Sequence, residues 1–378
     1  MQLGKLLNFA IISAAIVGTS GCVESDNAMS EKVKAELKPE SKPLQLAYEY
    51  VGLAVQKKDT HVWGTSPVLG RDGRVHLYVA EWPQPKKKTM SFRGYFSTSE
   101  IAHYVGDTPA GPFEFVRMAV TDQNDNFNAP HNPTIQFIDD QYVLTFIVNE
   151  NDDRGKQRII MYVSDDLNDQ WRPAKGAEAD GTILRKPSDS KIWNHTSVRG
   201  VANPTLVKHN GEYVLYFKSA IPDPKKDLND FKNREFGYGV ATAKSIEGPY
   251  TIHPERLTSK EMELEDAYAF SYNGSMHIIS RDIVGTLGDK EGGLLWTSQD
   301  GFSFSAEDTQ RSFESLVSYT GKEALAGANV YRGSDKGQLE RPQLLIENGQ
   351  PTYMYVATGI NANQGYGSSS HVFKINVK

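Results

Sequence analysis

The sequence predicts an all-β fold, a five-bladed β-propeller with about four antiparallel strands in each blade. The first observation is a polar residue, usually followed by proline and then by an apolar run, that recurs five times at intervals of 63 to 75 residues. Radial repetition of small sheets is typical of propellers, so each copy predicts one blade. The five copies begin at Ser66-Pro67, Asn132-Pro133, Asn203-Pro204, Asp266-Ala267 and Arg341-Pro342.

Turns supply the second observation, because a turn follows each copy and leads into another apolar or aromatic run. Asn-Gly and Asp-Gly pairs between such runs are typical of β-hairpins. The third observation is a second strand pattern later in each unit. An ordinary β-sandwich with coincidental turns is the alternative, but it does not explain five copies in phase. The turns are Asp72-Gly73, Asp139-Asp140, Asn210-Gly211, Asn273-Gly274 and Asn348-Gly349.

Composition narrows the possible functions. The chain has 378 residues and a net charge of −6 without a basic stripe, so nucleic-acid binding is not expected. Cys22 is the only cysteine, which excludes an intramolecular disulfide. The sequence has no Cys/His metal motif and no EF-hand loop.

The N-terminus differs from the rest of the chain. Lys5, the short apolar run 6–17 and the small residues before Cys22 predict a secretory signal over residues 1–22. This segment resembles a bacterial lipoprotein signal, which implies lipidation of Cys22, export and anchoring to a bacterial membrane, at the outer membrane or the periplasmic face. A simple signal peptide with an incidental cysteine is the alternative. Residues 23–43 are charged and predict a flexible tether.

The propeller is expected to span residues 44–378. Its first apolar and aromatic segment, Tyr48–Val55, is predicted to be a strand. This strand either pairs with the last blade, which would close the ring, or opens the first blade. The sequence leaves both possibilities open.

The acidic residues at the start of the fourth and fifth copies are the candidate catalytic groups. The first strand of every blade lines the central channel of a propeller, so residues at the starts of these strands converge. Glu265, Asp266 and Glu340 are such residues. On a regular strand, Glu265 and Asp266 would point to opposite faces, so both reach a common pocket only if the strand is irregular there.

The five-fold repeat, the Asn-Pro pairs, the Gly-Pro-aromatic triplets and the acidic start of the fourth copy resemble the five-bladed propeller glycosidases. These are glycoside hydrolase families 43 and 117 and the related sucrose- and fructan-cleaving families. The resemblance implies an Asp in blade one that acts as base or nucleophile, an Asp in a middle blade that tunes the pKa of the acid, and a Glu in a later blade that is the acid. Those positions fall on Ser66, Asn203 and Glu265, so two of the three are not carboxylates here.

The working hypothesis makes Glu265 the general acid and Asp266 the base that activates water, with Glu340 in reserve, because glycoside hydrolysis needs two carboxyl groups. No cofactor is required, although a channel calcium would follow family precedent. Each remaining candidate also has a structural alternative. A Trp can pack in the core between blades, a His can be hydrogen-bonded within a loop, and an Arg can bridge strands. The predicted substrate-binding residues are Trp63, Ser66, His131, Asn132, His195, Arg199, Asn203, Arg281 and Arg341.

The sequence therefore predicts a secreted glycoside hydrolase, exo-acting on a plant or algal polysaccharide or oligosaccharide. Two alternatives stay open. One is a glycan-binding propeller that has lost catalysis, as Ser66 and Asn203 would suggest. The other is a polysaccharide lyase that acts on uronic sugars with His and Arg side chains.

Overall fold

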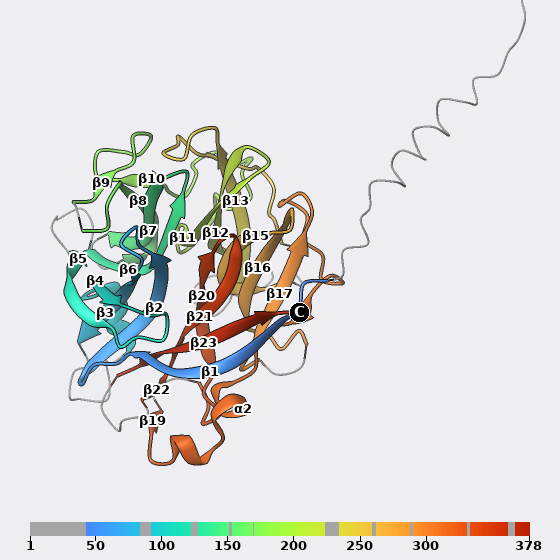
Figure 1. Cartoon of the computed structure of the whole chain (residues 1–378). Helices are drawn as coiled ribbons and strands as arrows, with labels where there is room; N and C mark the ends of the chain where they lie inside the picture. Colours follow the sequence, from blue (N-terminus) through green and yellow to red (C-terminus); the bar gives the residue numbers. More distant parts are fainter. Residues whose placement is uncertain are drawn as a thin grey trace, which may run out of the picture. The chain divides into compact units, whose positions relative to one another are not determined.

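Antiparallel sheets form five blades in the order that the sequence predicts (Figure 1). The structure is a computed structural model that describes residues 43–83, 92–121, 128–150, 153–168, 170–223, 234–258, 262–287, 290–330, 333–361 and 367–378. The predicted signal peptide, Cys22 and nearly all of the predicted tether lie outside the described residues. The blades belong to one unit, Gln45–Lys378.

The first three blades follow one another along the chain. Blade one contains β2 (Thr60–Leu69), β3 (Val75–Pro83), β4 (Glu100–Gly106) and β5 (Glu114–Val120). Blade two contains β6 (Asn128–Ile138), β7 (Gln141–Glu150), β8 (Asp153–Ser164) and β10 (Thr182–Leu184), with β9 (Arg172–Pro173) beside β8. Blade three contains β11 (Ala202–His209), β12 (Glu212–Pro222), β13 (Arg234–Ala243) and β14 (Thr251–Ile252).

The last two blades complete the ring. Blade four contains β15 (Leu264–Tyr272), β16 (Ser275–Asp282), β17 (Gly293–Ser298) and β18 (Gln310–Arg311). Blade five contains β20 (Leu339–Glu347), β21 (Gln350–Thr358), β23 (Ser369–Val377) and β1 (Leu46–Val55). The remaining elements are the pair β19 (Asn329–Val330) and β22 (Ile360–Asn361), the short helix α2 (Leu316–Thr320) and the 3₁₀ turns η1 (Phe92–Phe96) and η2 (Glu323–Leu325).

Strand β1 closes the propeller by pairing with the last blade. It runs antiparallel to β23, from the pair Leu46 and Val377 to the pair Val55 and Ser370. Of the two possibilities that the sequence leaves open, the structure therefore has the pairing with the last blade. The two ends of the unit are joined in one sheet, so no blade has to hold the ring closed through side chains alone.

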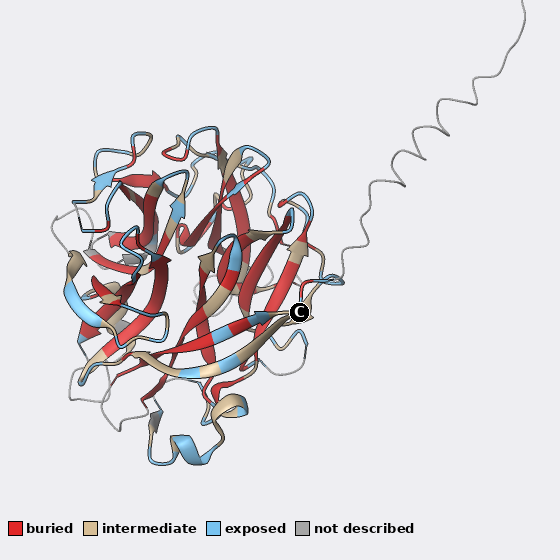
Figure 2. Cartoon of the chain, in the orientation of Figure 1, coloured by how far each residue is buried: buried red, intermediate tan, exposed pale blue. Residues whose placement is uncertain are grey.

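The first strands surround a common axis, and apolar side chains fill the space between blades. Strands β2, β6, β11, β15 and β20 contact one another in turn, and β20 contacts β2. Between blades three and four, Tyr216, Tyr238, Met276 and Trp296 belong to one buried cluster. Figure 2 shows the strands mostly buried and the connecting loops mostly exposed. Burial of each large apolar side chain contributes roughly 1.5–3 kcal/mol.

A β-bulge interrupts the first strand of every blade at the same place. In blade four, for example, the pairing skips from Glu265 to Tyr268 while the partner strand moves from Arg281 to Ile279. The bulged residue adopts a left-handed conformation, as it does in one class of β-bulge. The five left-handed residues are Gly64 (φ 59°), Asn132 (50°), Asn203 (50°), Asp266 (58°) and Arg341 (54°).

The position of the bulge in β2 shows that the predicted alignment of blade one with the other blades was wrong by two residues. The blade-one counterpart of Asn132 and Asp266 is Gly64, and the predicted counterpart, Ser66, lies two residues further along β2. Ser66 is buried between strands, where its hydroxyl donates to Gln343 Oε1 at 3.1 Å and accepts from the Ile135 amide at 3.0 Å. The Ser66-Pro67 pair resembles the other copies in sequence, but the strand distortion precedes it.

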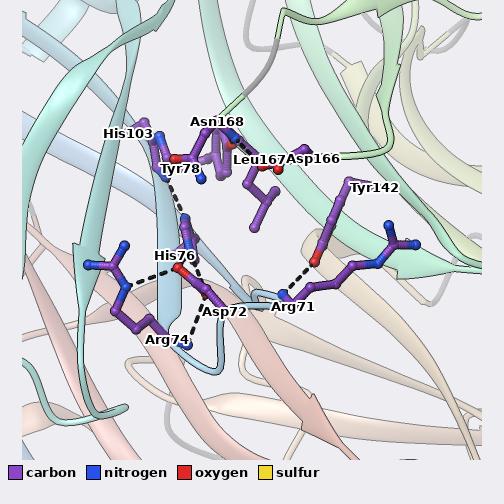
Figure 3. A network of polar contacts seen from close by, with 10 residues as sticks. All are labelled: Arg71, Asp72, Arg74, His76, Tyr78, His103, Tyr142, Asp166, Leu167 and Asn168. Atoms are coloured by element: carbon purple, nitrogen blue, oxygen red, sulfur yellow. Dashed lines mark hydrogen bonds and ion pairs between the residues drawn. The ribbon is translucent and has the colours of Figure 1, made fainter.

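A polar network connects blade one to blade two near the turn that follows β2, beyond the end of the strand that lies away from the bulge (Figure 3). The backbone amide of Arg71 donates to the Tyr142 hydroxyl at 2.9 Å. Behind it, His76 Nε2 contacts Asp72 at 3.2 Å and His76 Nδ1 contacts His103 Nε2 at 2.8 Å. These contacts fit two neutral imidazoles, in which His76 donates to Asp72 and His103 donates to His76.

Candidate active site

A polar cavity of about 470 Å³ lies where the first strands begin. It brings together nine of the predicted site residues, from all five blades and the segment before β11. Ser66, His195 and Arg341 are not among the described residues that line it. The predicted residues that line it are Trp63, His131, Asn132, Arg199, Asn203, Glu265, Asp266, Arg281 and Glu340.

Ion pairs hold two of the three carboxylates in place. Glu265 Oε1 accepts from Lys218 Nζ at 2.9 Å, and Glu265 Oε2 lies 3.2 Å from Arg281 Nη1. The same Arg281 nitrogen lies 2.7 Å from Oε2 of Glu340. With its amide oriented to satisfy both groups, Gln338 accepts a further bond from Arg281 Nε at 2.6 Å. Arg281 therefore bridges blade four and blade five at the cavity wall.

Asp266 reaches the cavity because the bulge turns it to the same side as Glu265. Its Oδ1 accepts a bond of 2.9 Å from Asn203 Nδ2, and the Tyr238 hydroxyl accepts the amide of the following residue, Ala267, at 3.0 Å. Burial and the nearby charge of Glu265 raise the pKa of Asp266, although Lys218 opposes this shift. These surroundings favour the protonated form of the Asp266 carboxyl group.

Arg341 lies behind the cavity wall. Its side chain is fully buried, and its Nη2 donates to the Asn132 carbonyl at 2.9 Å and to Thr134 Oγ1 at 3.1 Å. A Cβ atom on Gly64 would lie 3.3 Å from Arg341 Nε. Arg341 therefore joins blade five to blade two and fills the space beside the blade-one bulge, which explains why it does not line the cavity.

Aromatic side chains form the blade-one wall of the cavity. The ring of Phe92 lies 4.8 Å from Trp63 and 5.4 Å from Trp82, and Tyr95 lies 5.3 Å from His131. Faces of aromatic rings at a pocket wall can stack against the apolar face of a sugar. Of the rings of Trp63, Trp82, Phe92 and Tyr95, that of Trp63 is among the substrate-binding residues that the sequence predicts.

The two predicted histidines have different surroundings. His131 lines the cavity, and its Nδ1 contacts the Ala129 carbonyl at 2.7 Å. Burial lowers the pKa of His131 to about 4, so its ring is neutral at pH 7. His195 contacts the Ile192 carbonyl at 2.9 Å within a turn outside the cavity lining, which is the loop role that the sequence leaves open for it.

The sequence does not single out the basic and aromatic residues that blade three adds to the wall. Lys218, Arg234 and Phe236 line the cavity, and Lys218 pairs in register with Ala202, next to the bulge at Asn203. A residue opposite a strand start faces the same space as that start, so the hairpin register is the signal for Lys218. Arg234 and Phe236 lie on β13, whose register the repeat pattern does not specify.

A second cavity, of about 600 Å³, lies at the turn end of the same strands and is lined mostly by apolar side chains, including Leu69, Phe137 and Phe270. Among the residues that the structure describes, no group of three or more His, Cys, Asp or Glu side chains is arranged to hold a metal ion. The described helices are all too short or too polar to cross a membrane.

No protein-family model and no curated protein matches the sequence. Solved structures do match. A family 117 glycoside hydrolase of the marine bacterium Zobellia galactanivorans has a TM-score of 0.59 at 15% identity, over 88% of this chain and 90% of that chain. A protein of unknown function from Dyadobacter fermentans has a TM-score of 0.56 at 11% identity, over 89% and 100%.

A GH43_1 enzyme from Xanthomonas citri, in complex with xylotriose, has a TM-score of 0.51 at 11% identity, over 87% of this chain and 90% of that chain. At these identities the likeness concerns the fold. The chain therefore has the five-bladed propeller fold found in glycoside hydrolases of families 43 and 117.

Proposed function

We propose that the protein is a glycoside hydrolase whose reaction takes place at Glu265, Asp266 and Glu340. The observation that carries this proposal is that three carboxylates from two neighbouring blades share one polar cavity with an aromatic wall. Hydrolysis of a glycosidic bond needs a carboxylic acid and a second carboxylate near the bond. The fold shared with glycoside hydrolases supports the same reaction class.

The contacts favour Asp266 as the proton donor and Glu265 as the ionised partner, which reverses the roles expected from the sequence. Burial raises the pKa of Asp266, and a general acid must keep its proton until the leaving oxygen takes it. Glu265 forms ion pairs with Lys218 and Arg281, and both are contacts of the ionised form. An ionised carboxylate can activate water or attack the anomeric carbon.

Further features of this proposal rest on the cavity size and on the first residues of the chain. A volume of about 470 Å³ suits a small ligand or the end of a glycan, in line with exo action. The lipoprotein-like segment that ends at Cys22 suits an enzyme exported to meet polysaccharide outside the cell. Loss of membrane association in a Cys22→Ser variant would test the anchor.

A glycan-binding propeller without catalysis is the second candidate. One observation favours it, because protein side chains already engage each of the three carboxylates: Lys218 and Arg281 at Glu265, Arg281 at Glu340, and Asn203 at Asp266. The blade-one position that would bring a further carboxylate is Gly64. Binding without turnover is what this candidate predicts.

The test compares Glu265→Gln, Asp266→Asn and Glu340→Gln with the parent protein on natural oligosaccharides and on aryl glycosides. We expect Asp266→Asn to lose about 10²–10⁴-fold in rate on natural substrates but far less on aryl glycosides, whose leaving groups need no proton. Glu265→Gln should lose activity on both substrate types. Glu178→Gln, which removes an exposed carboxylate, is the matched control.

Turnover by the parent protein that all three variants retain would rule out this site as the place of hydrolysis. Tight binding of oligosaccharides with no turnover by the parent protein would favour the binding module. An ultraviolet-absorbing unsaturated product from a uronate polymer would indicate a lyase instead.

A further inference from the structure

The five bulge residues lie at the same place in the strands that surround the channel, and blade one contributes no side chain there. Hydrogen bonds of 2.8 Å and 2.9 Å join the side chains of Asn132, Asn203 and Asp266. Arg341, the bulge residue of blade five, reaches past blade one and donates to the Asn132 carbonyl at 2.9 Å. Among the five residues, Gly64 alone offers neither a donor nor an acceptor from a side chain.

The Arg341 guanidinium keeps unused donors beside that position. The side chain is fully buried, and Nη2 donates to the Asn132 carbonyl and to Thr134 Oγ1. Nε and Nη1 have no hydrogen-bond partner in the described part of the chain. Apart from chain neighbours, the three atoms nearest to a Cβ placed on Gly64 would be Nε, Cδ and Cγ of Arg341, at 3.3 to 3.5 Å. The unused Nε donor therefore adjoins the place that a blade-one side chain would take.

The charge of Arg341 is not matched by a bonded carboxylate. Its nitrogens bond only to a carbonyl and a hydroxyl of the described residues. Burial lowers the pKa of Arg341, and Asp266 opposes this effect from a distance. The Oδ1 atom of Asp266 already accepts from Asn203, and burial favours its neutral form. A guanidinium group keeps its proton in proteins, so the positive charge stays inside the fold.

The blade-one bulge borders the cavity and has a further unused donor. Pairing between β2 and β3 skips Gly64 and Thr65, and Trp63, which precedes them, lines the cavity. The Thr65 hydroxyl is buried and has no partner among the residues that the structure describes. A buried charge and buried donors without partners are costly, and an anion that accepts their hydrogen bonds would remove this cost.

We propose that Arg341 binds a small monovalent anion beside the blade-one bulge, at its Nε and Nη1 nitrogens. The anion is either a halide or the carboxylate group of a molecule the size of formate. A monovalent ion neutralises one guanidinium, whereas a divalent ion such as sulfate brings one charge more than Arg341 can balance. The bound ion would connect blade five to blade one, where the ring of blades closes. The inference goes beyond the proposed function, since it requires neither a sugar nor hydrolysis.

Thermal unfolding of the full chain tests the site. Chloride, formate and sulfate are titrated separately at constant ionic strength, with a bulky sulfonate as the background anion. A ligand that binds only the folded state raises Tm as its concentration passes Kd. We expect a saturable rise of about 2–4 °C with chloride or formate and none with sulfate. The lower Kd of the two identifies the ion as a halide or a carboxylate.

Two variants assign the response to this position. Gly64→Asp places a carboxylate of the chain beside Arg341, and Arg341→Gln removes the charge, so both should abolish the response. Arg172→Gln removes an arginine that pairs with Glu247 outside the cavity lining, and it should keep the full response. If Arg341→Gln does not fold, Gly64→Asp decides.

Crystals soaked in bromide or formate should show one of the two ions within hydrogen-bond distance of Arg341 Nε or Nη1. Water alone at these nitrogens would overturn the inference, and so would an equal Tm response in the parent protein and in Gly64→Asp, which would indicate an adventitious ion only. Such a failure leaves the proposed hydrolysis intact, because the tests of Glu265, Asp266 and Glu340 do not depend on the anion. Absence of turnover with a specific anion response would have the opposite meaning.

Discussion

Asn203 and Asp266 occupy the same bulge position in neighbouring blades, and the Asn203 amide donates a 2.9 Å hydrogen bond to Oδ1 of Asp266. Asn132, the bulge residue of blade two, in turn donates to Oδ1 of Asn203 at 2.8 Å. A chain of left-handed residues thus passes from blade to blade and ends on the carboxyl group that the site is built around.

Replacing Asn203 with Asp should make stability depend on pH. The change puts a second buried carboxylate where an N–H donor now meets Asp266, and two such groups repel when both are ionised. We expect Asn203→Asp to lower the free energy of unfolding at pH 8 by about 1–3 kcal/mol and to recover part of it at pH 5. Urea denaturation at both pH values measures this. Asn203→Ala, which adds no charge, is the control, and an equal pH response in both variants would contradict the prediction.

Substitutions at Gly64 should depend on charge more than on size. The left-handed φ of 59° costs an ordinary residue about 1–2 kcal/mol, and a Cβ atom would lie 3.3 Å from Arg341 Nε. Aspartate tolerates this conformation, and its carboxylate can accept from Arg341, whose Nε and Nη1 form no hydrogen bond among the described residues. Gly64→Asp should therefore be more stable than Gly64→Ala in urea denaturation.

The isosteric variant Gly64→Asn separates charge from backbone preference at this position. It has the same tolerance for the left-handed region but no charge for Arg341. An Asp variant that is no more stable than the Asn variant would show that the buried guanidinium gains nothing from a carboxylate beside it.

Lys218→Gln should move the alkaline side of the activity profile to higher pH. Burial and Glu265 raise the pKa of Asp266, and the positive charge of Lys218 opposes the rise. Without that charge Asp266 keeps its proton to higher pH, so a reaction that needs the protonated group declines later. The dependence of kcat/KM on pH measures the shift. Lys244→Gln, an exposed lysine paired with Glu212, is the control, and a shift to lower pH would argue against Asp266 as the acid.

Acid should destabilise the fold through buried histidines. Burial lowers the pKa of His103 to about 3 and that of His131 and His371 to about 4. The unfolded chain binds protons near pH 6.5 and the folded chain does not, so stability is complete above pH 6.5 and falls as pH drops towards 4. Each histidine contributes up to about 1.4 kcal/mol per pH unit.

His103→Gln tests this acid sensitivity. Glutamine keeps an N–H donor for His76 in the network of Figure 3 but does not titrate, so the slope of unfolding free energy against pH between 4 and 6 should decrease. The exposed His253→Gln is the matched control. An unchanged slope in His103→Gln would mean that His103 is protonated without opening the blade.

The repeat pattern was enough to predict the blades, because hairpin turns and apolar runs are local features. The sheets follow the five predicted copies in order, and turns such as Asn210-Gly211 and Asn273-Gly274 connect the first two strands of their blades. The pattern also indicated that Glu265 and Asp266 can share a pocket only on an irregular strand, and the bulge at Asp266 is that irregularity. The segment that ends at Cys22 lies outside the described residues, so its role stays a prediction.

Only the tertiary structure decided which polar residues meet. A bulge of one residue changes the face of every side chain before it, and its position depends on how the blades pack rather than on the local sequence. For this reason Gly64 rather than Ser66 occupies the blade-one position, and Arg341 lies behind the wall instead of in it. Lys218 and Arg281 meet Glu265 through strand register and blade contact, which join residues far apart in the chain.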